Sequence, residues 1–348
     1  MHLARGAVDV AYVLPIRWRD PDGVPELRDY LADLRPHVAE LIVVDGSPEA
    51  VFRAVDAALP PRTEHARPDP AHRGAMGKVP GVLTGLARAR SDCVVVADDD
   101  VRWSPDGLRR ARTLLDAAEV VRPQNFFEPL VWHARWDSAR SLLNRVWSGE
   151  RDLGPGDFPG TLALRAGFVR RIGGYDGDCL FENLELMRSV IAAGGRVATP
   201  LDLFVARRPP TARHFTSQRV RQAYDDFAIP GRMAAWLALG PSAALALNRR
   251  RYGLIAAAAA ASIAIAETGR RRGGGATVLP ISGALLAPAW LAERAICSWL
   301  ALGARLLRGG VAYGDVRLSR SAHSVSELRA TLDGSPSTSP DAWNPIDL

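Results

Sequence analysis

The chain has 348 residues, of which 47% are hydrophobic, and it carries a formal net charge of +6 that comes mostly from arginine. This length suits one large α/β domain with an appendage, and the apolar fraction supplies ample material for a core. The basic balance favours phosphorylated ligands or an anionic membrane surface. A nucleic-acid partner is not expected, because acidic residues are plentiful and no nucleic-acid-binding motif is present.

Cysteine usage and the N-terminal segment indicate a reducing compartment. Cys93, Cys179 and Cys297 are far apart and show no CxxC spacing, so we expect small buried side chains rather than a zinc site or disulfides. The apolar part of residues 1–15 is too short for a signal peptide and lacks a cleavage pattern. Secretion is therefore not expected.

Strand-like and helical segments alternate along the first part of the chain. In order they are a strand at 8–16, a helix at 25–38, a strand at 40–47, helices at 48–59 and 81–90, and a strand at 93–97. This alternation predicts a parallel, doubly wound sheet, in which ligands bind beyond the carboxyl ends of the strands. Pro15, Asp45 and the run Asp98–Asp100 each fall at such an end. Three loops are thus expected to converge on one crevice.

The run Asp98–Asp100 directly follows the apolar strand at 93–97. Carboxylates this close raise one another's pKa and cost stability unless a cation lies among them. The alternative is a solvated turn in which an aspartate caps the next helix, because "SPDG" soon follows. The position of the run in a shared crevice favours a functional role.

The middle of the chain is less regular. An amphipathic helix is predicted at 131–147, and a glycine-proline loop at 154–160 enters a strand. A further helix is predicted at 179–195, and a basic helix within 213–227. We expect these segments to complete a first domain that spans residues 1–229.

The composition changes after Pro230. Uncharged stretches separated by arginine clusters occupy 233–248, 252–266 and 273–292. The last has the length of a membrane span but contains Pro280 and Pro288. If the first stretch crossed a membrane, Arg249–Arg251 would lie outside, against the positive-inside tendency. We therefore expect interfacial helices or a partial hairpin with arginines facing anionic headgroups; the alternative is a soluble alanine-rich bundle.

Composition thus divides the chain into three consecutive parts. After the first domain, residues 230–310 are predicted to form hydrophobic, membrane-associated helices. Residues 311–348 form a C-terminal tail that is expected to be disordered from Gly334 onward.

Several motifs in order give the first part a family resemblance. The segments "VLPI", "VVDGS", "GK", "GLARARSD", "VVVADDDV", "FPGTLALRAGFVRRIGGYDGDCLFENLEL" and "QRVRQAY" resemble a family 2 glycosyltransferase of the GT-A fold, over about residues 8 to 228. The hydrophobic part with "GGVAYGDVRL" is similar to membrane-associated members, such as ceramide-glucosyltransferase-like enzymes. The resemblance implies an α/β, Rossmann-like nucleotide-sugar-binding domain followed by a hydrophobic helical region.

The resemblance implies a cation site at the aspartates. Asp98 and Asp100 match the two acidic places of the family's Asp-x-Asp pattern, and Asp99 occupies the variable place beside the substrate. Asp98 would contact the nucleotide or the metal, and Asp100 would bind Mg²⁺ or Mn²⁺, which take hard oxygen ligands. His214 matches the place of a third metal ligand in some GT-A enzymes, although a lone histidine is more often structural.

The resemblance also implies donor-binding residues. Asp45 matches the aspartate that binds the nucleotide base or ribose, with a turn-stabilising role before Gly46 as the alternative. Lys78 matches the lysine of the family's "GK" segment and would add positive charge near the diphosphate. Pro15 and Gly160 are expected to line the same site.

The expected catalytic base is missing from its usual place. The family shows Glu-Asp before "LEL", whereas this chain has Glu182 and Asn183 there, and an amide takes no proton from an acceptor hydroxyl. Either Glu182 acts as the base, or Glu185 reaches in from the next turn, or the protein binds sugar nucleotides without turning them over. Asn183 would orient the acceptor, and Glu182 is the preferred base.

A weakened motif follows near the end of the first domain. Gln218 and Arg221 match the family's Gln-x-x-Arg-Trp motif, but Gln222 replaces the tryptophan. This departure suggests transfer of a single sugar. Arg219 and Arg221 suit phosphate, and an interfacial basic helix is the alternative.

The sequence therefore predicts a metal-dependent, inverting hexosyltransferase at the cell membrane with a cytoplasmic catalytic domain. It would move one sugar from a nucleotide-sugar, by resemblance a UDP-sugar, to a lipid-linked or amphipathic acceptor. The alternatives are a catalytically weak nucleotide-sugar-binding protein and a sugar-phosphate nucleotidyltransferase. The lack of a glycine-rich loop after the first strand counts against the latter.

Overall fold

The computed structural model describes residues 7–149, 160–314 and 316–334, which form two compact units. Of the described residues, the sheet unit comprises 7–122, 160–198 and 323–334, and the helical unit comprises 123–149, 199–314 and 316–322. The units interleave along the chain and therefore do not follow the boundaries that composition suggests. The predicted loop at 154–159 and the tail after Gly334 lie outside the described residues.

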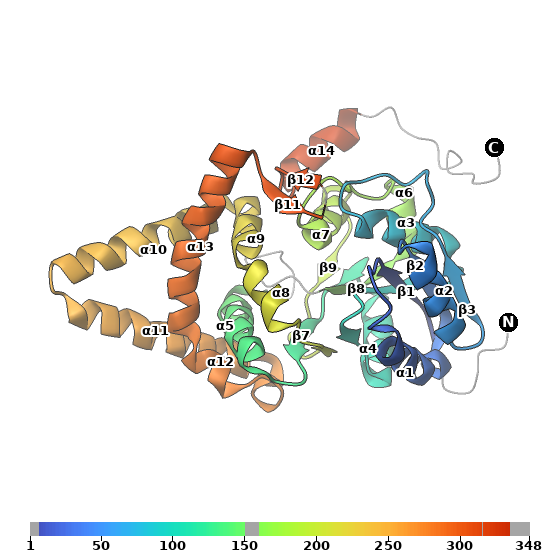
Figure 1. The fold of residues 1–348 in the computed structure, drawn as a ribbon, viewed down its shortest axis with the longest axis horizontal. Coiled ribbons are helices and arrows are strands. Elements are labelled where there is room, and N and C mark those ends of the chain that lie inside the picture. The colour runs from blue at the N-terminus through green and yellow to red at the C-terminus, as the bar shows by residue number, and fades with distance from the viewer. Residues whose placement is uncertain (1–6, 150–159, 315, 335–348) are drawn as a thin grey trace. The chain divides into compact units, whose positions relative to one another are not determined.

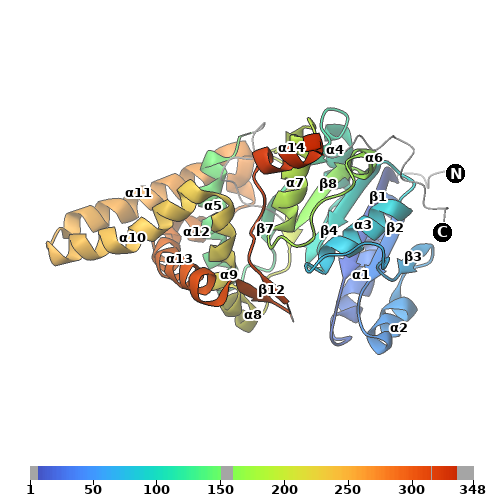
Figure 2. The same ribbon diagram turned by 90° about the horizontal axis from the view of Figure 1, so that it is seen from above.

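The sheet unit is built on one mixed sheet with the strand order β3-β2-β1-β4-β8-β6-β9. The strands are β1 (Val8–Ile16), β2 (Val38–Asp45), β3 (Thr63–Ala66), β4 (Cys93–Ala97), β6 (Val120–Val121), β8 (Thr161–Arg165) and β9 (Val197–Ala198). Strands β3, β2, β1 and β4 are parallel, as the sequence predicts, whereas β8 runs antiparallel to both β4 and β6. Figure 2 shows β2, β1, β4 and β8 side by side.

The antiparallel strand β8 has a direct consequence for the predicted site. Thr161 pairs with Ala97, so the start of β8 lies beside the carboxyl end of β4. Gly160 and Asp98, the residues just beyond these two ends, are therefore neighbours. A fully parallel sheet would have placed Gly160 at the opposite end of β4.

The helices of the sheet unit are α1 (Val24–Leu34), α2 (Glu49–Ala58), α3 (Lys78–Arg88), α4 (Pro105–Leu114), α6 (Ala166–Arg171), α7 (Glu182–Ala192) and α14 (Val325–Gly334), as Figure 1 shows. Helix α1 ends earlier than predicted because Pro36 has no amide proton to continue the α-helical hydrogen bonds, and Arg35–His37 forms a 3-10 turn instead. Helix α3 packs closely on β1 through glycines. A Cβ on Gly85 would lie 2.2 Å from Cγ1 of Val13, and one on Gly81 would lie 2.9 Å from Cβ of Pro15.

The helical unit contains a parallel strand pair, β7 (Gln124–Phe127) with β10 (Phe204–Arg207), and an antiparallel hairpin, β11 (Val311–Tyr313) with β12 (Val316–Leu318). Its helices are α5 (Trp132–Trp147), α8 (Ala212–Ser217), α9 (Arg219–Tyr224), α10 (Pro230–Asn248), α11 (Tyr252–Arg271), α12 (Ile281–Leu285) and α13 (Ala287–Arg308). Helices α10 and α11 form a long hairpin that extends away from α5 and α12 (Figures 1 and 2).

The apolar core of the helical unit lies where α5, α11, α12 and α13 meet. It consists of Ala139, Leu142, Leu143, Ala266, Leu279, Ala284, Ala287 and Trp290. A Cβ on Gly269 would lie 1.9 Å from the carbonyl oxygen of Leu142, so only glycine lets α11 cross α5 this closely. The stretch 273–292 is not one helix, because Gly273 and Gly274 have φ values of 56° and 72° and Pro280 precedes α12.

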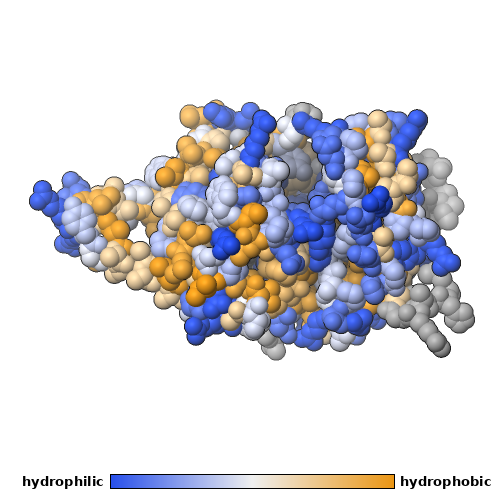
Figure 3. Space-filling model, turned by 60° about the horizontal axis from the view of Figure 1, so that its bottom comes forward, coloured by the Kyte–Doolittle hydropathy of each residue, from blue (hydrophilic) through white to orange (hydrophobic). Residues whose placement is uncertain are grey.

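The outer helices of this unit expose large apolar side chains. The exposed ones on α10 to α13 are Leu245, Leu247, Tyr252, Leu254, Ile265, Ile281, Leu285, Ile296, Trp299, Leu300, Leu306 and Leu307. Figure 3 shows orange patches along the α10–α11 hairpin and a hydrophilic tip, where Arg249–Arg251 join the two helices. By length and composition alone, Tyr252–Thr277 is the one helical stretch among the described residues that would be able to cross a membrane.

Candidate active site

Three elements of the sheet unit bring charged side chains together at the carboxyl end of β4. Lys78 begins α3, Glu182 begins α7, and Asp98 follows β4. The Lys78 Nζ lies 2.6 Å from Oδ1 of Asp98 and 2.7 Å from Oε1 of Glu182. All three side chains are at most 25% exposed. Burial alone would lower the pKa of Lys78, but the charges and hydrogen bonds of Asp98 and Glu182 outweigh it and raise the pKa strongly.

The loops before α3 and α7 are bonded to each other, which fixes the distance between Lys78 and Glu182. The amide of Met76 donates to the carbonyl of Gly177 at 2.8 Å, and the amide of Ala75 donates to Oδ1 of Asp178 at 2.8 Å. A Cβ on Gly177 would lie 2.8 Å from Cα of Gly74, so the two backbones approach more closely than any other residue would allow.

Gly160 forms a cradle for Asp98. The amide of Asp98 donates to the Gly160 carbonyl at 2.9 Å, and a Cβ on Gly160 would lie 2.2 Å from Oδ2 of Asp98. Any larger residue at 160 would displace this carboxylate. The glycine makes room for the Asp98 carboxylate, and the hard carboxylate oxygens of Asp98 and Asp100 fit the ligand chemistry of Mg²⁺ or Mn²⁺.

Asp99 has a different set of neighbours from Asp98. Its carboxylate accepts a hydrogen bond from Nε1 of Trp18, and its carbonyl accepts one from Nη1 of Arg102 at 2.6 Å. Arg102 also stacks over the ring of Tyr30, 4.6 Å from its centroid. The middle aspartate therefore holds the loop in place, which explains how three adjacent carboxylates are accommodated.

Asp45 ends β2 and is fully buried. Its Oδ1 accepts from the amide of Ser47 at 2.7 Å, and its Oδ2 lies 3.5 Å from Nε2 of His65 on β3. Burial would raise the pKa of Asp45, but the hydrogen bonds from His65 and Ser47 lower it. Burial would likewise lower the pKa of His65, and the carboxylates of Asp45 and Asp56 raise it instead. The turn-stabilising role of Asp45 is thus observed, in a pair with a histidine that stacks on Phe52.

The other candidates on α7 differ in their surroundings from Glu182. Asn183 is 8% exposed and Glu185 is fully buried. Glu185 accepts from the backbone amide of His323 at 2.8 Å and pairs with the Nδ1 of that residue at 2.9 Å. Glu182 alone of the two glutamates contacts Lys78 in the described structure.

The remaining candidates lie in other parts of the fold. Pro15 lies in β1 opposite Val44, with Gly81 of α3 packed against it. His214 is an exposed residue of α8, and Gln218 accepts from Arg221 at 3.1 Å in the helical unit. The guanidinium of Arg221 lies over the ring of Tyr313, 4.6 Å from its centroid.

Arg219 takes part in a buried network of the helical unit. Its Nη1 lies 3.0 Å from Oδ1 of Asp137 and 3.5 Å from Oε1 of Glu293, and its guanidinium stacks on Phe215 at 3.9 Å. The side chain is 9% exposed. The guanidinium nitrogens of Arg219 thus donate to acceptors within the helical unit.

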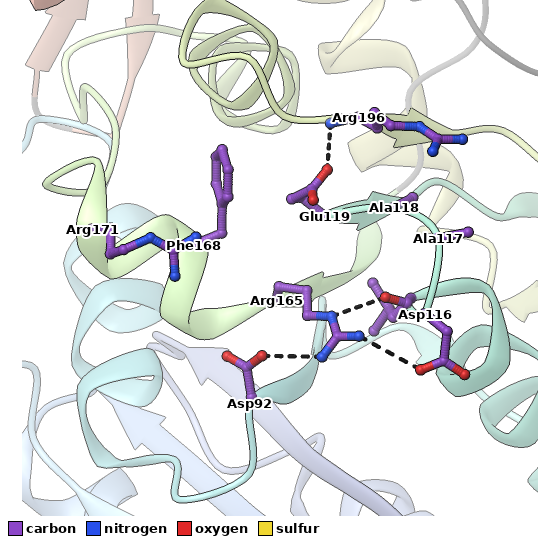
Figure 4. Close-up of a pocket in the computed structure, with 10 residues that line it drawn as sticks. Asp92, Asp116, Ala117, Ala118, Glu119, Arg165, Phe168, Arg171 and Arg196 are labelled. Carbon is purple, nitrogen blue, oxygen red and sulfur yellow. Dashed lines mark hydrogen bonds and ion pairs between the residues drawn. The ribbon is translucent and has the colours of Figure 1, made fainter.

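A pocket of about 390 Å³ lies at the other end of β4 (Figure 4). It is lined by residues that include Arg165, Asp92 and Asp116, and Arg165 pairs with Cys93 at the start of the strand. Figure 4 shows Arg165 between its two acidic partners, 3.3 Å from Asp92 and 3.5 Å from Asp116. The pocket is thus separate from the Lys78 site, and its arginine, Arg165, is paired with Asp92 and Asp116 of the same lining.

Sequence reasoning missed His65 and Trp18. His65 lies on a strand too short to be predicted, and its pairing with Asp45 depends on β3 lying beside β2. Trp18 follows β1 closely, so the expected convergence of strand-end loops was the signal that would have found it.

Comparison with known proteins rests on structure. No family model and no curated protein matches the chain. A mannosyltransferase from Pyrobaculum calidifontis, solved in complex with GDP-Man and Mn²⁺, matches with a TM-score of 0.51 and 20% identity over 83% of this chain and 86% of that chain. A glucosyl-3-phosphoglycerate synthase from Mycobacterium tuberculosis matches with a TM-score of 0.39 and 19% identity over 60% of this chain and 75% of that chain. The first likeness confirms the predicted GT-A fold.

Proposed function

We propose that the protein is a metal-dependent, inverting glycosyltransferase that moves a single sugar from a nucleotide-sugar to a lipid-linked or amphipathic acceptor. The observation that carries this proposal is the bridge from Lys78 to both Asp98 and Glu182. It joins the expected donor-binding carboxylate to the expected base at the carboxyl edge of the sheet, where ligands bind in open α/β sheets. The fold likeness to a protein solved with GDP-Man and Mn²⁺ supports the same class of donor.

Asp98 and Asp100 would hold Mg²⁺ or Mn²⁺, which supplies charge neutralisation for the departing diphosphate. Lys78 lies within contact of Asp98 and adds a positive charge to the same place. Asp45, held by His65, would bind the base or ribose through its carboxylate. The family resemblance favours UDP-sugars and the fold likeness adds GDP-sugars, so both donor classes belong in the test.

Glu182 would act as the general base. Its carboxylate takes the proton of the acceptor hydroxyl while the acceptor oxygen bonds to the anomeric carbon. The bond from that carbon to the diphosphate oxygen breaks, and its electron pair leaves with the diphosphate. Lys78 pairs with Glu182 at 2.7 Å and would be the cation that the diphosphate meets.

The acceptor class is proposed from the helical unit. Exposed leucine, isoleucine and tryptophan side chains on α10 to α13, with Arg249–Arg251 between α10 and α11, suit the interface of an anionic membrane. A lipid-linked acceptor would be presented at that interface. We place the protein at the cell membrane with the sheet unit in the cytoplasm.

Donor calorimetry tests the proposal. The full chain is titrated with UDP, GDP and their sugars, with and without Mn²⁺ or Mg²⁺, and the titrations are repeated with Asp100→Asn. The exposed Asp106→Asn on α4 is the matched control. Metal-dependent binding that is lost in Asp100→Asn and kept in Asp106→Asn supports the donor site, whereas no binding of any nucleotide refutes it.

The reaction is then read from the products. Slow hydrolysis of the bound donor to free sugar and nucleoside diphosphate supports a transferase. Binding with no turnover in the presence of lipid acceptors supports a nucleotide-sugar-binding protein. Release of pyrophosphate from a nucleoside triphosphate and a sugar phosphate supports a nucleotidyltransferase instead.

A further inference from the structure

Four side chains that the proposed sugar transfer does not use converge within the sheet unit. They are Asp176, Cys179, Glu185 and His323, and one ligand atom from each lies within 4.8 Å of the others. Cys179 and Glu185 are buried, and His323 arrives from the chain segment that precedes α14. The set mixes a thiol, an imidazole and two carboxylates, so it is not a surface cluster of acids.

Three of the six distances among these four atoms match the edges of a coordination tetrahedron. The Nδ1 of His323 lies 3.5 Å from Sγ of Cys179 and 3.8 Å from Oδ2 of Asp176, and Sγ lies 3.7 Å from that same Oδ2. Zinc bonds of about 2.0–2.3 Å in a tetrahedron put ligand atoms about 3.3–3.8 Å apart. A fourth distance, from Nδ1 of His323 to Oε1 of Glu185, is a 2.9 Å hydrogen bond that would lengthen when a metal replaces its proton.

Each carboxylate offers one oxygen to this point and has its other oxygen held by the backbone. Oδ1 of Asp176 accepts from the amide of Asp178 at 2.8 Å, and Oε2 of Glu185 accepts from the amide of His323 at 2.8 Å. The carbonyl of His323 accepts from Nη1 of Arg188 at 2.7 Å. Partners of this kind fix the orientation of metal ligands.

We propose that Asp176, Cys179, Glu185 and His323 bind one Zn²⁺. A thiolate and an imidazole exclude Mg²⁺ as the preferred ion, and the mixed S, N and O donors suit zinc. Binding releases the thiol proton of Cys179 and any proton on Nδ1 of His323 to solvent. The site shares no ligand with the Asp98 and Asp100 site and does not depend on the proposed function.

The zinc would have a structural role near the base. It would connect the segment before α14 to α7, the helix that begins with Glu182. All four candidate ligands would be protein side chains, which is the pattern of a closed structural site rather than a catalytic one.

Metal analysis of the full chain tests this site. After dialysis against zinc and removal of the excess, the wild type is expected to retain one equivalent of zinc by mass spectrometry. Cys179→Ser and His323→Gln are each expected to bind zinc about 100-fold or more weakly. Cys93→Ser is the matched control because Cys93 is also a buried free cysteine, and Asp100→Asn controls for the other cation site. Both controls are expected to keep the zinc.

A second measurement holds even if a variant fails to fold. Cobalt added to the metal-free wild type is expected to give the near-ultraviolet charge-transfer band of a thiolate ligand, with the intense visible bands of tetrahedral geometry. A wild type that binds no zinc, or a cobalt spectrum without the thiolate band, overturns the proposal. Zinc retention by folded Cys179→Ser at the wild-type level overturns it as well. Failure of donor binding leaves this result unaffected.

Discussion

The two units of the molecule differ in where their charged and apolar side chains lie. The sheet unit buries valine-rich strands such as β4 and gathers charged side chains at the strand ends, where Lys78 bridges Asp98 and Glu182. The helical unit buries ion pairs, among them Arg219 with Asp137, and exposes leucine and tryptophan on its outer helices. A basic residue can therefore indicate a ligand site at the strand ends of the sheet unit and a buried ion pair in the helical unit.

The phosphate-binding role of Arg219 and Arg221 stays a prediction, and the contrast between the units offers a structural alternative for Arg219. An arginine-rich helix suggests phosphate binding, yet burying a guanidinium is costly unless carboxylates and carbonyls satisfy its donors. Arg219 has such partners within its own unit, whereas Lys78 lies beside the strand end at which the sheet places ligands. A buried cation whose partners lie within its own unit, such as Arg219, is interpreted as structural, whereas a cation at the ligand-binding edge of the sheet, such as Lys78, is a functional candidate.

The largest expected effect concerns the base in the sheet unit. Glu182→Gln is expected to lower kcat for donor hydrolysis by about 10²–10⁴-fold, because the amide cannot accept the proton of the attacking hydroxyl. Steady-state kinetics with the donor found by calorimetry measures this. Glu185→Gln is the companion variant and is expected to lower thermal stability through the lost His323 contacts. A normal kcat in Glu182→Gln would rule out this base.

The second prediction concerns the buried pair in the helical unit. Arg219→Met is expected to lower the free energy of unfolding by about 3–5 kcal/mol, because Asp137 stays buried without its partner. Arg271→Met, at an exposed arginine, is expected to cost less than about 1 kcal/mol. Denaturant unfolding measures both. Unchanged stability with weakened donor binding would restore the phosphate-binding role that the sequence predicts.

The third prediction concerns the apolar surface of the helical unit. Replacing Arg249, Arg250 and Arg251 with glutamine is expected to weaken binding to anionic vesicles about 100-fold, from about 1 kcal/mol per arginine near the surface. The control replaces Arg28, Arg53 and Arg88, exposed arginines of the sheet unit, and changes the charge equally. Vesicle co-sedimentation measures the binding. An equal loss of vesicle binding in both triple variants would mean that the binding depends on net charge alone and not on the position of Arg249–Arg251.

Washing membranes extends this test. Release of the protein by high salt alone contradicts a spanning helix and fits an interfacial one. Retention in salt with release only by detergent would favour α11 as a membrane span, since Tyr252–Thr277 is long and apolar enough.

The smallest expected effect concerns Asp45 and His65 in the sheet unit. The pKa of His65 is raised in the fold, so its stabilising contribution is full below the unfolded pKa of about 6.5 and is lost as pH rises through the folded value. The pKa of Asp45 is lowered, so its contribution is lost only as pH falls through the folded value. The wild type is therefore expected to lose more stability than His65→Gln between pH 6 and 8, a window set by that pKa of about 6.5. Urea midpoints across this window check it, and parallel curves would contradict it.

The sequence predicts the positions of individual strands better than the way in which distant segments pair. The strands at 8–16 and 93–97 are confirmed as β1 and β4, because runs of buried valine leave little choice of structure. The antiparallel direction of β8 was not foreseen, since periodicity carries no information on strand direction. The fold class nevertheless follows from the order of motifs.

The candidate site was predictable as a set of residues but not as a set of contacts. Asp98 at a strand end follows from pattern alone, whereas the bond from Lys78 to Glu182 joins positions 104 residues apart. The pairing of Arg219 with Asp137 joins positions 82 residues apart, so the basic motif alone did not reveal it. The surroundings of Cys179 depend on His323, 144 residues later, so a lone cysteine gave no signal of a ligand set.

The return of the chain to the sheet unit at His323 also sets an order of events during synthesis. Glu185 on α7 obtains its partner His323 only after the whole segment Thr199–Ala322 has been translated. Burying this carboxylate before that partner is present would be costly, which disfavours the final packing of α7 in a shorter nascent chain. The contacts of Glu185 are thus completed only after helices α10 to α13 have been translated.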